Sequence, residues 1–220
     1  MSEAHADPAV LTLGPPLDRA AAVGILLHGR GGTAQGILGL AEAIDRPDVA
    51  WLAPQAAGNA WYPRTFLAPL ADNEPWLTSA LAAVGRLVDH AGGMGVPPER
   101  VVIAGFSQGG CLGLEFAARR ARRYGGVAGL SSGLIGPPGT PRDYAGSFVG
   151  TPVFLGCSDR DPHIPLERVD ETAEVLARMG AEVAKRIYPG MGHTVIGDEI
   201  DQLRAVVDAT RGALAGSEEG

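Results

Sequence analysis

Apolar residues in this chain fall into short continuous runs that are separated by longer stretches of mixed polarity. A continuous run without alternation predicts a strand buried on both faces, while apolar positions spaced three and four apart predict an amphipathic helix. We therefore expect strands at residues 10–13, 21–27, 49–53, 101–104, 127–131, 153–156 and 183–188. Helices are expected at 34–44, 75–91, from the glycines at 109–110 to about 123, at 166–179, and from 198 to about 214.

The alternation of strands with helices predicts an α/β fold, with a mostly parallel sheet of about six to seven strands covered by helices on both faces. At 220 residues, we expect a single domain over 1–220, with flexible tails at 1–9 and 215–220. Chemistry in such sheets lies at the carboxyl ends of the strands. The loops expected at that edge span residues 28–33, 105–109, 157–165 and 189–193.

One irregular segment, residues 55–75, is unusually long for a compact domain and concentrates aromatic side chains. Two interpretations stay open: a surface loop held by its own aromatic cluster, or the wall or lid of an apolar substrate pocket. Loop-borne apolar residues near the same edge of the sheet are candidates for pocket walls. They are Trp61, Phe66, Leu134, Ile135 and Ile164.

Composition narrows the classes of partner. The net charge of −7 disfavours binding to nucleic acid or to an anionic membrane surface, since both need a basic face. No apolar run reaches the roughly 20 residues of a membrane span, so no membrane insertion is expected. Residues 1–9 lack the features of a signal peptide, which favours a cytoplasmic protein. The two cysteines, Cys111 and Cys157, are expected to be buried free thiols.

The sequence Gly-Phe-Ser-Gln-Gly at residues 105–109 follows a buried strand and precedes a helix. This context is typical of the sharp strand-to-helix turn that presents a nucleophilic serine, here Ser107. The glycines have no Cβ, which allows strand and helix to approach closely and the turn to adopt a strained conformation.

A serine hydroxyl is a weak nucleophile and needs a histidine base that is oriented by a carboxylate. In α/β-hydrolases these groups follow in the order serine, acid, histidine. His193 follows the last strand and is the clearest candidate for the base. Either Asp159 or Asp161 is a candidate for the acid, and the pattern alone does not choose between them.

Acyl transfer also needs backbone N–H donors for the oxyanion. One is expected at Gln108, the residue after the nucleophile, and a second in the glycine-rich loop around Arg30. A phosphate-binding loop at residues 28–32 is disfavoured because the Gly-Lys-Ser/Thr ending is missing. Neither a metal-binding motif nor a cofactor fingerprint is found, so no metal and no cofactor are expected.

These motifs resemble the phospholipase/carboxylesterase family of α/β-hydrolases, which includes acyl-protein thioesterases. The resemblance covers about residues 20–212 and rests on four motifs: Leu-His-Gly-Arg-Gly at 27–31, Gly-Phe-Ser-Gln-Gly-Gly at 105–110, Asp-Arg-Asp-Pro-His-Ile-Pro at 159–165 and Gly-Met-Gly-His-Thr at 190–194. The Trp-Tyr-Pro at 61–63 and Asn-Glu-Pro-Trp-Leu at 73–77 are similar to the bacterial carboxylesterase branch.

The resemblance implies that Asp161 is the acid, because the family's aspartate directly precedes the Pro-x-x-Pro stretch, and that the amide of Arg30 is the second oxyanion donor. Arg30 departs from the family's thioesterases, which usually carry an uncharged residue there; its side chain is expected either to favour a small ester or to pair with a local acid. We therefore expect a serine carboxylesterase acting on small or short-to-medium-chain esters. The alternatives are a thioesterase or lysophospholipase, and a non-catalytic binding protein. The expected partner is a small ester substrate. The sequence does not decide the oligomeric state, and a homodimer is one of the expected possibilities.

Overall fold

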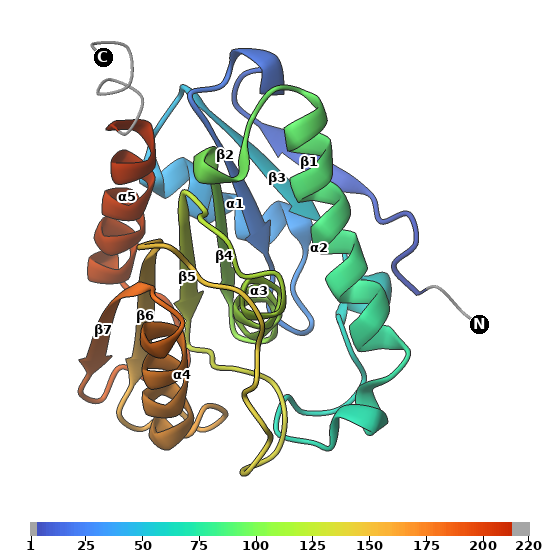
Figure 1. The fold of residues 1–220 in the computed structure, drawn as a ribbon, viewed down its shortest axis with the longest axis vertical. Coiled ribbons are helices and arrows are strands. Elements are labelled where there is room, and N and C mark those ends of the chain that lie inside the picture. The colour runs from blue at the N-terminus through green and yellow to red at the C-terminus, as the bar shows by residue number, and fades with distance from the viewer. Residues whose placement is uncertain (1–3, 213–220) are drawn as a thin grey trace.

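The computed structural model describes residues 4–212, in which seven strands form one sheet in the order β1-β3-β2-β4-β5-β6-β7 (Figure 1). The strands are β1 (Val10–Leu13), β2 (Ala22–Leu27), β3 (Val49–Pro54), β4 (Val101–Phe106), β5 (Gly126–Leu130), β6 (Pro152–Ser158) and β7 (Glu182–Tyr188). Only β1, at one edge, is antiparallel to its neighbour. The predicted α/β fold with a mostly parallel sheet is confirmed.

Five α-helices cover the two faces of the sheet in the described part of the chain. They are α1 (Ala34–Ile44), α2 (Trp76–Gly93), α3 (Gln108–Arg119), α4 (Leu166–Arg178) and α5 (Gly197–Gly212). Side chains of β2 alternate between the faces: Ile25 and Leu27 lie on the face covered by α2 and α3, while Ala22 and Leu26 lie on the face covered by α1 and α5. In Figure 1, α3 lies in front of the sheet and α1 behind it. All six residues of β2 are buried, as a continuous apolar run predicts.

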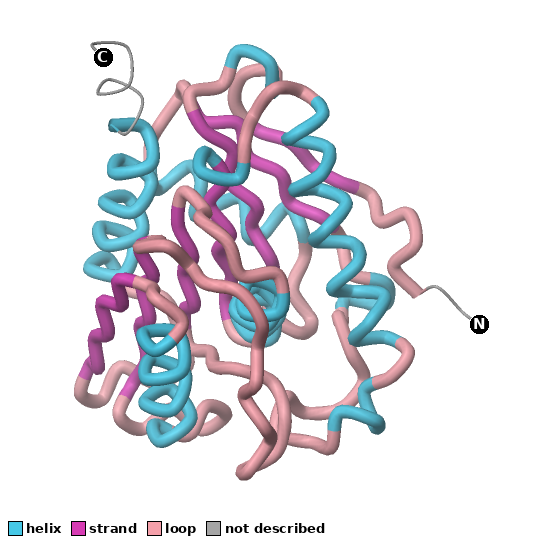
Figure 2. The backbone as a smooth tube through the Cα atoms, in the orientation of Figure 1, coloured by secondary structure: helices cyan, strands magenta, loops and turns pink. Residues whose placement is uncertain are grey.

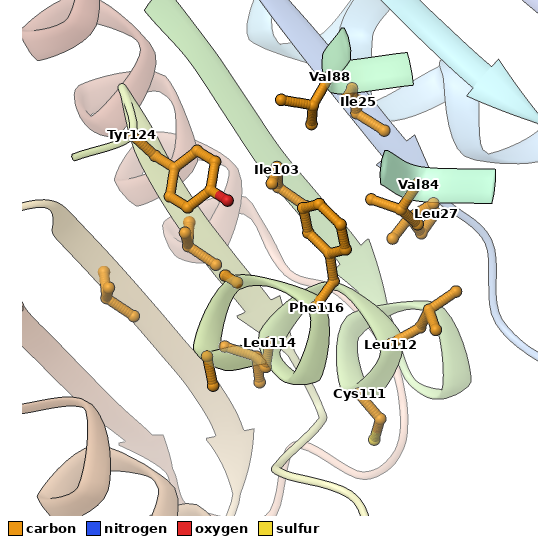
Figure 3. Close-up of a cluster of buried hydrophobic side chains, with 14 of the residues drawn as sticks. Ile25, Leu27, Val84, Val88, Ile103, Cys111, Leu112, Leu114, Phe116 and Tyr124 are labelled. Carbon is orange, nitrogen blue, oxygen red and sulfur yellow. The ribbon is translucent and has the colours of Figure 1, made fainter. Parts of the chain in front are cut away.

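The centre of the larger core lies between the sheet and α3. In Figure 3 the Phe116 ring of α3 points toward Ile103 on β4, and Val84 and Val88 of α2 lie beside Leu27 and Ile25 of β2. These side chains are at most 5% exposed. Each contributes about 1.5–3 kcal/mol by burial, so β4 and α3, the two elements that flank Ser107, rest on a well-packed layer.

The parallel strands direct the functional loops to one end of the molecule. The arrows of the parallel strands in Figure 1 point downward, and the longest loop segments of Figure 2 gather at that lower end. Residues 28–33, 55–75, 107, 159–165 and 189–196 all follow strands at this edge. The sheet thereby brings together segments that are distant in the sequence.

The helix after Ser107 ends several residues earlier than predicted. Helix α3 ends at Arg119 instead of near residue 123, because the chain turns there to bury Tyr124 completely. The Tyr124 hydroxyl donates to the carbonyl of Arg120 at 2.8 Å, and the Tyr124 N–H donates to Thr151 Oγ1 at 2.9 Å.

The prediction of a flexible tail over residues 1–9 is wrong at His5. This side chain is 1% exposed and lies between Trp61 and Trp76, with ring-centroid distances of 5.5 and 5.8 Å. Its Nε2 lies 2.9 Å from the Trp61 carbonyl oxygen, and its N–H donates to Ser79 Oγ at 2.9 Å. The predicted tails at 1–3 and at 215–220 lie outside the described residues.

Candidate active site

Ser107 occupies a strained turn between β4 and α3. Its φ of 52° and ψ of −120° place a non-glycine residue in a region that costs about 1–3 kcal/mol. The turn requires its glycines. A Cβ on Gly105 would lie 2.5 Å from the carbonyl carbon of Gly109, and one on Gly109 would overlap the Leu27 carbonyl. The close approach of β4, α3 and β2 therefore holds the Ser107 hydroxyl at the edge of the sheet.

His193 and Asp161 complete a hydrogen-bonded chain with Ser107. His193 Nε2 lies 2.9 Å from Ser107 Oγ, and His193 Nδ1 lies 2.7 Å from Asp161 Oδ2. The other carboxylate oxygen, Asp161 Oδ1, accepts the N–H groups of His163 at 2.8 Å and Ile164 at 3.0 Å. Burial alone would raise the pKa of Asp161, but the hydrogen bonds from His193 and these amides outweigh it and hold the pKa below its usual value.

Asp159, which the sequence pattern left as an alternative acid, has a different position. Its Oδ1 accepts the N–H of Gly190 at 2.7 Å, on the loop that carries His193. Ser158 Oγ lies 3.3 Å from the N–H of Gly192 and supports the same loop. Of the two aspartates, the structure brings only Asp161 into hydrogen-bond contact with His193.

Gln108 and Arg30 both face the cavity beside Ser107. Gln108 is the first residue of α3, where an N–H has no acceptor within the helix. Arg30 lies in a tight turn closed by the Gly32 N–H and the Gly29 carbonyl at 3.0 Å, and the φ of 76° at Gly31 explains why glycine follows Arg30. The two residues expected to supply the oxyanion donors are thus adjacent to the nucleophile.

The side chains of Arg30 and Gln108 hold the 55–75 segment in place. The Arg30 guanidinium donates to the carbonyls of Tyr62, Pro63 and Arg64 at 2.9, 3.1 and 2.5 Å, so its partners are carbonyl groups and not the local acid that the sequence left open. Gln108 accepts the Trp61 N–H at 2.9 Å and donates to the Tyr62 carbonyl at 2.8 Å.

The 55–75 segment is both pinned by aromatic packing and part of the cavity wall. Trp61 Nε1 donates to the His28 carbonyl at 2.8 Å, and the Trp61 and His28 rings lie 5.0 Å apart. Further along, the Phe66 carbonyl accepts the Gly136 N–H at 2.7 Å. Residues 62–66 also line the cavity. The segment is therefore both a loop held by aromatic packing and a wall of the cavity, so the two interpretations of the sequence are compatible.

The cavity beside Ser107 has a volume of about 570 Å³. Of the predicted wall residues, Phe66 and Ile164 line it. Trp61, Leu134 and Ile135 do not, and for them the prediction is wrong, because each is 0% exposed and packs in the core. The loop residues Leu134 and Ile135 turn inward, where their N–H groups donate to the buried side chains of Thr172 and Glu115.

Several cavity residues were absent from the prediction: Tyr62, Pro63, Arg64, Thr65, Phe106, Cys111 and His163. Phe106 and His163 rings each lie 4.8 Å from the His193 ring. A signal was available for these two, because both sit inside the motifs that carry the predicted triad. Arg64 and Thr65 had no such signal, because they lie between the motifs at 61–63 and 73–77. Cys111 is a buried free thiol, as expected, and burial raises its pKa to about 12.

Glu199 lies in the first turn of α5, shortly after the loop that carries His193. Its side chain is fully buried; Oε2 accepts the Ile196 N–H at 3.1 Å, while Oε1 has no hydrogen-bond partner and faces the backbone of Gly156. Burial raises the pKa of this carboxyl from 4.5 to about 7. The carboxyl group thus anchors the segment after His193 and titrates close to neutrality.

Among residues 4–212, no group of His, Cys, Asp and Glu side chains is arranged to hold a metal ion. Within the same range, no helix is long and apolar enough to cross a membrane.

Comparisons with known proteins point to one family. The model of a family described as phospholipase/carboxylesterase matches residues 11–210. Acyl-protein thioesterase 1 of Saccharomyces cerevisiae is 28% identical over 207 residues, covering 83% of this chain and 90% of that protein. Acyl-protein thioesterase 1 of Gibberella zeae is 38% identical over 117 residues, but the matched part spans only 50% of this chain and 48% of that protein.

Comparisons with solved structures point to the same family. A crystal structure of a phospholipase/carboxylesterase from Dyadobacter fermentans is 43% identical, with a TM-score of 0.88, and the match covers 91% of this chain and 96% of that chain. The carboxylesterase of Bacillus cereus has a TM-score of 0.74 over 94% of this chain and 97% of its own, and at 19% identity it is similar in fold alone.

Proposed function

Because the chain belongs to the phospholipase/carboxylesterase family of α/β-hydrolases and is therefore a hydrolase, we propose that it is a serine carboxylesterase acting on small or short-to-medium-chain esters. The observation that carries this proposal is the continuous hydrogen-bonded chain from Ser107 through His193 to Asp161. Such a chain converts a weak hydroxyl nucleophile into one that attacks a carbonyl at neutral pH.

In the proposed mechanism, Ser107 Oγ attacks the ester carbonyl while His193 Nε2 removes its proton. Asp161 holds His193 with Nδ1 protonated and stabilises the imidazolium that forms. His193 then donates the proton to the departing alcohol, which leaves an acyl group on Ser107. Water, activated by the same His193, attacks the acyl-enzyme and releases the carboxylic acid.

The negative charge on the carbonyl oxygen is assigned to the amides of Gln108 and Arg30. The Gln108 amide lies at the N-terminus of α3, where the helix dipole adds to its hydrogen bond. Each such donor contributes about 10²–10³ in rate in comparable enzymes. The Arg30 side chain is bound to carbonyls of the 62–64 stretch, which supports a fixed position for the Arg30 backbone.

The test is the substitution Ser107→Ala, assayed on 4-nitrophenyl butyrate. We expect kcat to fall by about 10⁶-fold, as in knockouts of other serine triads. Labelling with a fluorophosphonate, read by intact mass, should modify the wild-type chain once and leave Ser107→Ala unmodified. Wild-type protein that neither turns over the ester nor becomes labelled would instead support a non-catalytic binding protein.

A thioesterase is the second candidate, because two of the relatives are named acyl-protein thioesterases. The two candidates differ in acyl length and in leaving group. A series of acyl chains from two to sixteen carbons, on matched oxygen esters and thioesters, separates them. A maximum of kcat/KM at about four to eight carbons on oxygen esters supports the carboxylesterase, whereas a maximum on long-chain thioesters supports the alternative.

A further inference from the structure

The cavity beside Ser107 carries the opposite charge from the chain as a whole. Its lining contains Arg30, Arg64, His163 and His193 and neither an aspartate nor a glutamate, although the whole chain has a net charge of −7. A cleft lined by one sign of charge focuses the field and raises the local concentration of ligands of the opposite sign. The lining is therefore suited to an anion.

The two arginines are not equivalent. The Arg30 guanidinium is occupied by three carbonyl oxygens. The Arg64 guanidinium makes no hydrogen bond and no ion pair with any residue in 4–212, and it is exposed at the cavity. The donors of Arg64 are thus available to a ligand while those of Arg30 are not.

The backbone of Arg64 is nonetheless held firmly. Its N–H donates to Asn73 Oδ1 at 2.8 Å, and its carbonyl accepts from Arg30. Asn73 is itself 0% exposed and donates to the Thr65 carbonyl at 3.1 Å. A fixed backbone with an unoccupied guanidinium differs from an arginine on a loosely held surface loop, because the point at which the side chain leaves the backbone stays at the cavity wall.

Acidic groups close to the cavity do not neutralise this charge. Asp161 has a side chain that is 0% exposed and is used by His193 and two amides. Glu74, on the same loop as Arg64, accepts the Thr78 N–H at the start of α2 at 3.1 Å and is outside the cavity lining.

We propose that the Arg64 guanidinium binds an anionic group, a carboxylate or phosphate, of the ester substrate, so that the preferred substrates are acidic esters. Arginine presents two parallel N–H donors that match the two oxygens of such a group. Neutral esters enter the same cavity and react at Ser107 without this contact. This inference rests on the proposed function, because it names the class of ester that the same site prefers.

The anionic group belongs either to the acyl part or to the alcohol part of the ester, and two pairs of substrates distinguish these sources. For the acyl part, 4-nitrophenyl 5-carboxypentanoate is compared with its primary amide. For the alcohol part, 4-(carboxymethyl)phenyl butyrate is compared with its primary amide. Each pair has nearly the same shape and leaving group and differs in charge.

For wild-type protein we expect kcat/KM to be about tenfold higher for the carboxylate than for the amide in one of the two substrate pairs. The reason is that a hydrogen bond between two charged groups is stronger than one to a neutral amide. The preference should fall as NaCl is raised from about 0.02 to about 0.5 M, because salt screens an exposed pair. In Arg64→Gln the ratio of kcat/KM between the carboxylate and the amide should fall to about one, because the glutamine lacks the positive charge. The matched control is Arg178→Gln, since Arg178 is an exposed arginine at the end of α4 that is remote from the catalytic edge.

Equal rates within both pairs in wild-type protein would overturn the inference, as would a preference that survives in Arg64→Gln. An equal loss on carboxylate and amide in Arg64→Gln would show that Arg64 only supports the loop, and would overturn it too. Each of these results leaves the carboxylesterase function standing. Failure of wild-type protein to hydrolyse any of the four esters, together with absent fluorophosphonate labelling, would overturn the proposed function itself.

Discussion

At the scale of single residues, Asp159 and Asp161 show that two aspartates only two positions apart can have different roles. Both lie on the same loop after β6, and the side chain of Asp161 reaches His193 while that of Asp159 accepts the Gly190 N–H. One carboxylate therefore orients the proposed base directly, and the other supports the loop on which that base sits.

The comparison of Asp161→Asn with Asp159→Asn tests this division. In Asp161→Asn we expect kcat on 4-nitrophenyl butyrate to fall by about 10³–10⁴-fold, because an amide favours the wrong tautomer of His193. In Asp159→Asn a loss of less than about tenfold is expected, since a neutral oxygen still accepts the Gly190 N–H. Steady-state kinetics of both variants provide the measurement, and the reverse order of losses would assign the acid to Asp159.

Cys111 gives a second prediction at this scale. It lines the cavity, but burial raises the pKa of its thiol to about 12, so the reactive thiolate is nearly absent at pH 8. Incubation with iodoacetamide at pH 8 should leave esterase activity unchanged within about 10%, with peptide mapping showing Cys111 unmodified. Rapid loss of activity together with modification of Cys111 would show that the thiol is reactive.

At the scale of elements, the site depends on contacts between loops that follow different strands. The segment after β3 is fastened to the segment after β2 by Arg30 and to the start of α3 by Gln108. The cavity wall is therefore connected to both proposed oxyanion donors.

Replacement of Arg30 by alanine tests this connection. The variant loses three hydrogen bonds to the 62–64 carbonyls while keeping the Arg30 backbone amide. We expect kcat/KM for neutral esters to fall by about tenfold or more, because small displacements of catalytic groups are costly. Limited proteolysis should also cut residues 55–75 faster than in wild-type protein. Unchanged cleavage and unchanged kinetics would mean that the loop is held without Arg30.

The sequence was informative about elements and less informative about the contacts between them. The strand at 101–104 and the serine turn follow from continuous apolar runs and flanking glycines, which are local features. The burial of Tyr124, which ends α3 early, depends on Thr151 and is not a local property. Likewise, the hydrophobicity of Leu134 and Ile135 predicted burial but not whether they would face a cavity or the core.

At the scale of the whole molecule, buried ionisable groups link stability to pH. Glu199 is the clearest case, because burial raises its pKa from 4.5 to about 7. The folded state then holds a proton that the unfolded chain releases at lower pH, so this group lowers stability progressively as pH rises from about 4.5 to about 7.

Glu199→Gln, which stays neutral, tests this effect. The stability of the variant relative to wild-type protein should increase between pH 5 and pH 8, by up to about 3 kcal/mol, since each pKa unit corresponds to about 1.4 kcal/mol. Urea unfolding followed by fluorescence at several pH values measures the difference. Because the glutamine amide and the protonated acid differ in their hydrogen-bonding groups, only the slope with pH is diagnostic, and parallel curves for the two proteins would contradict the prediction.

The double use of Arg30 has a consequence for how such enzymes diverge. One residue lies at the proposed oxyanion position through its backbone and fastens the substrate wall through its side chain. A change in the wall that moves the 62–64 carbonyls would leave the Arg30 guanidinium without these three partners, so mutations at the two places are expected to be epistatic. Grafting a 55–75 segment from a relative with an uncharged residue at position 30 should therefore succeed only when both are exchanged together.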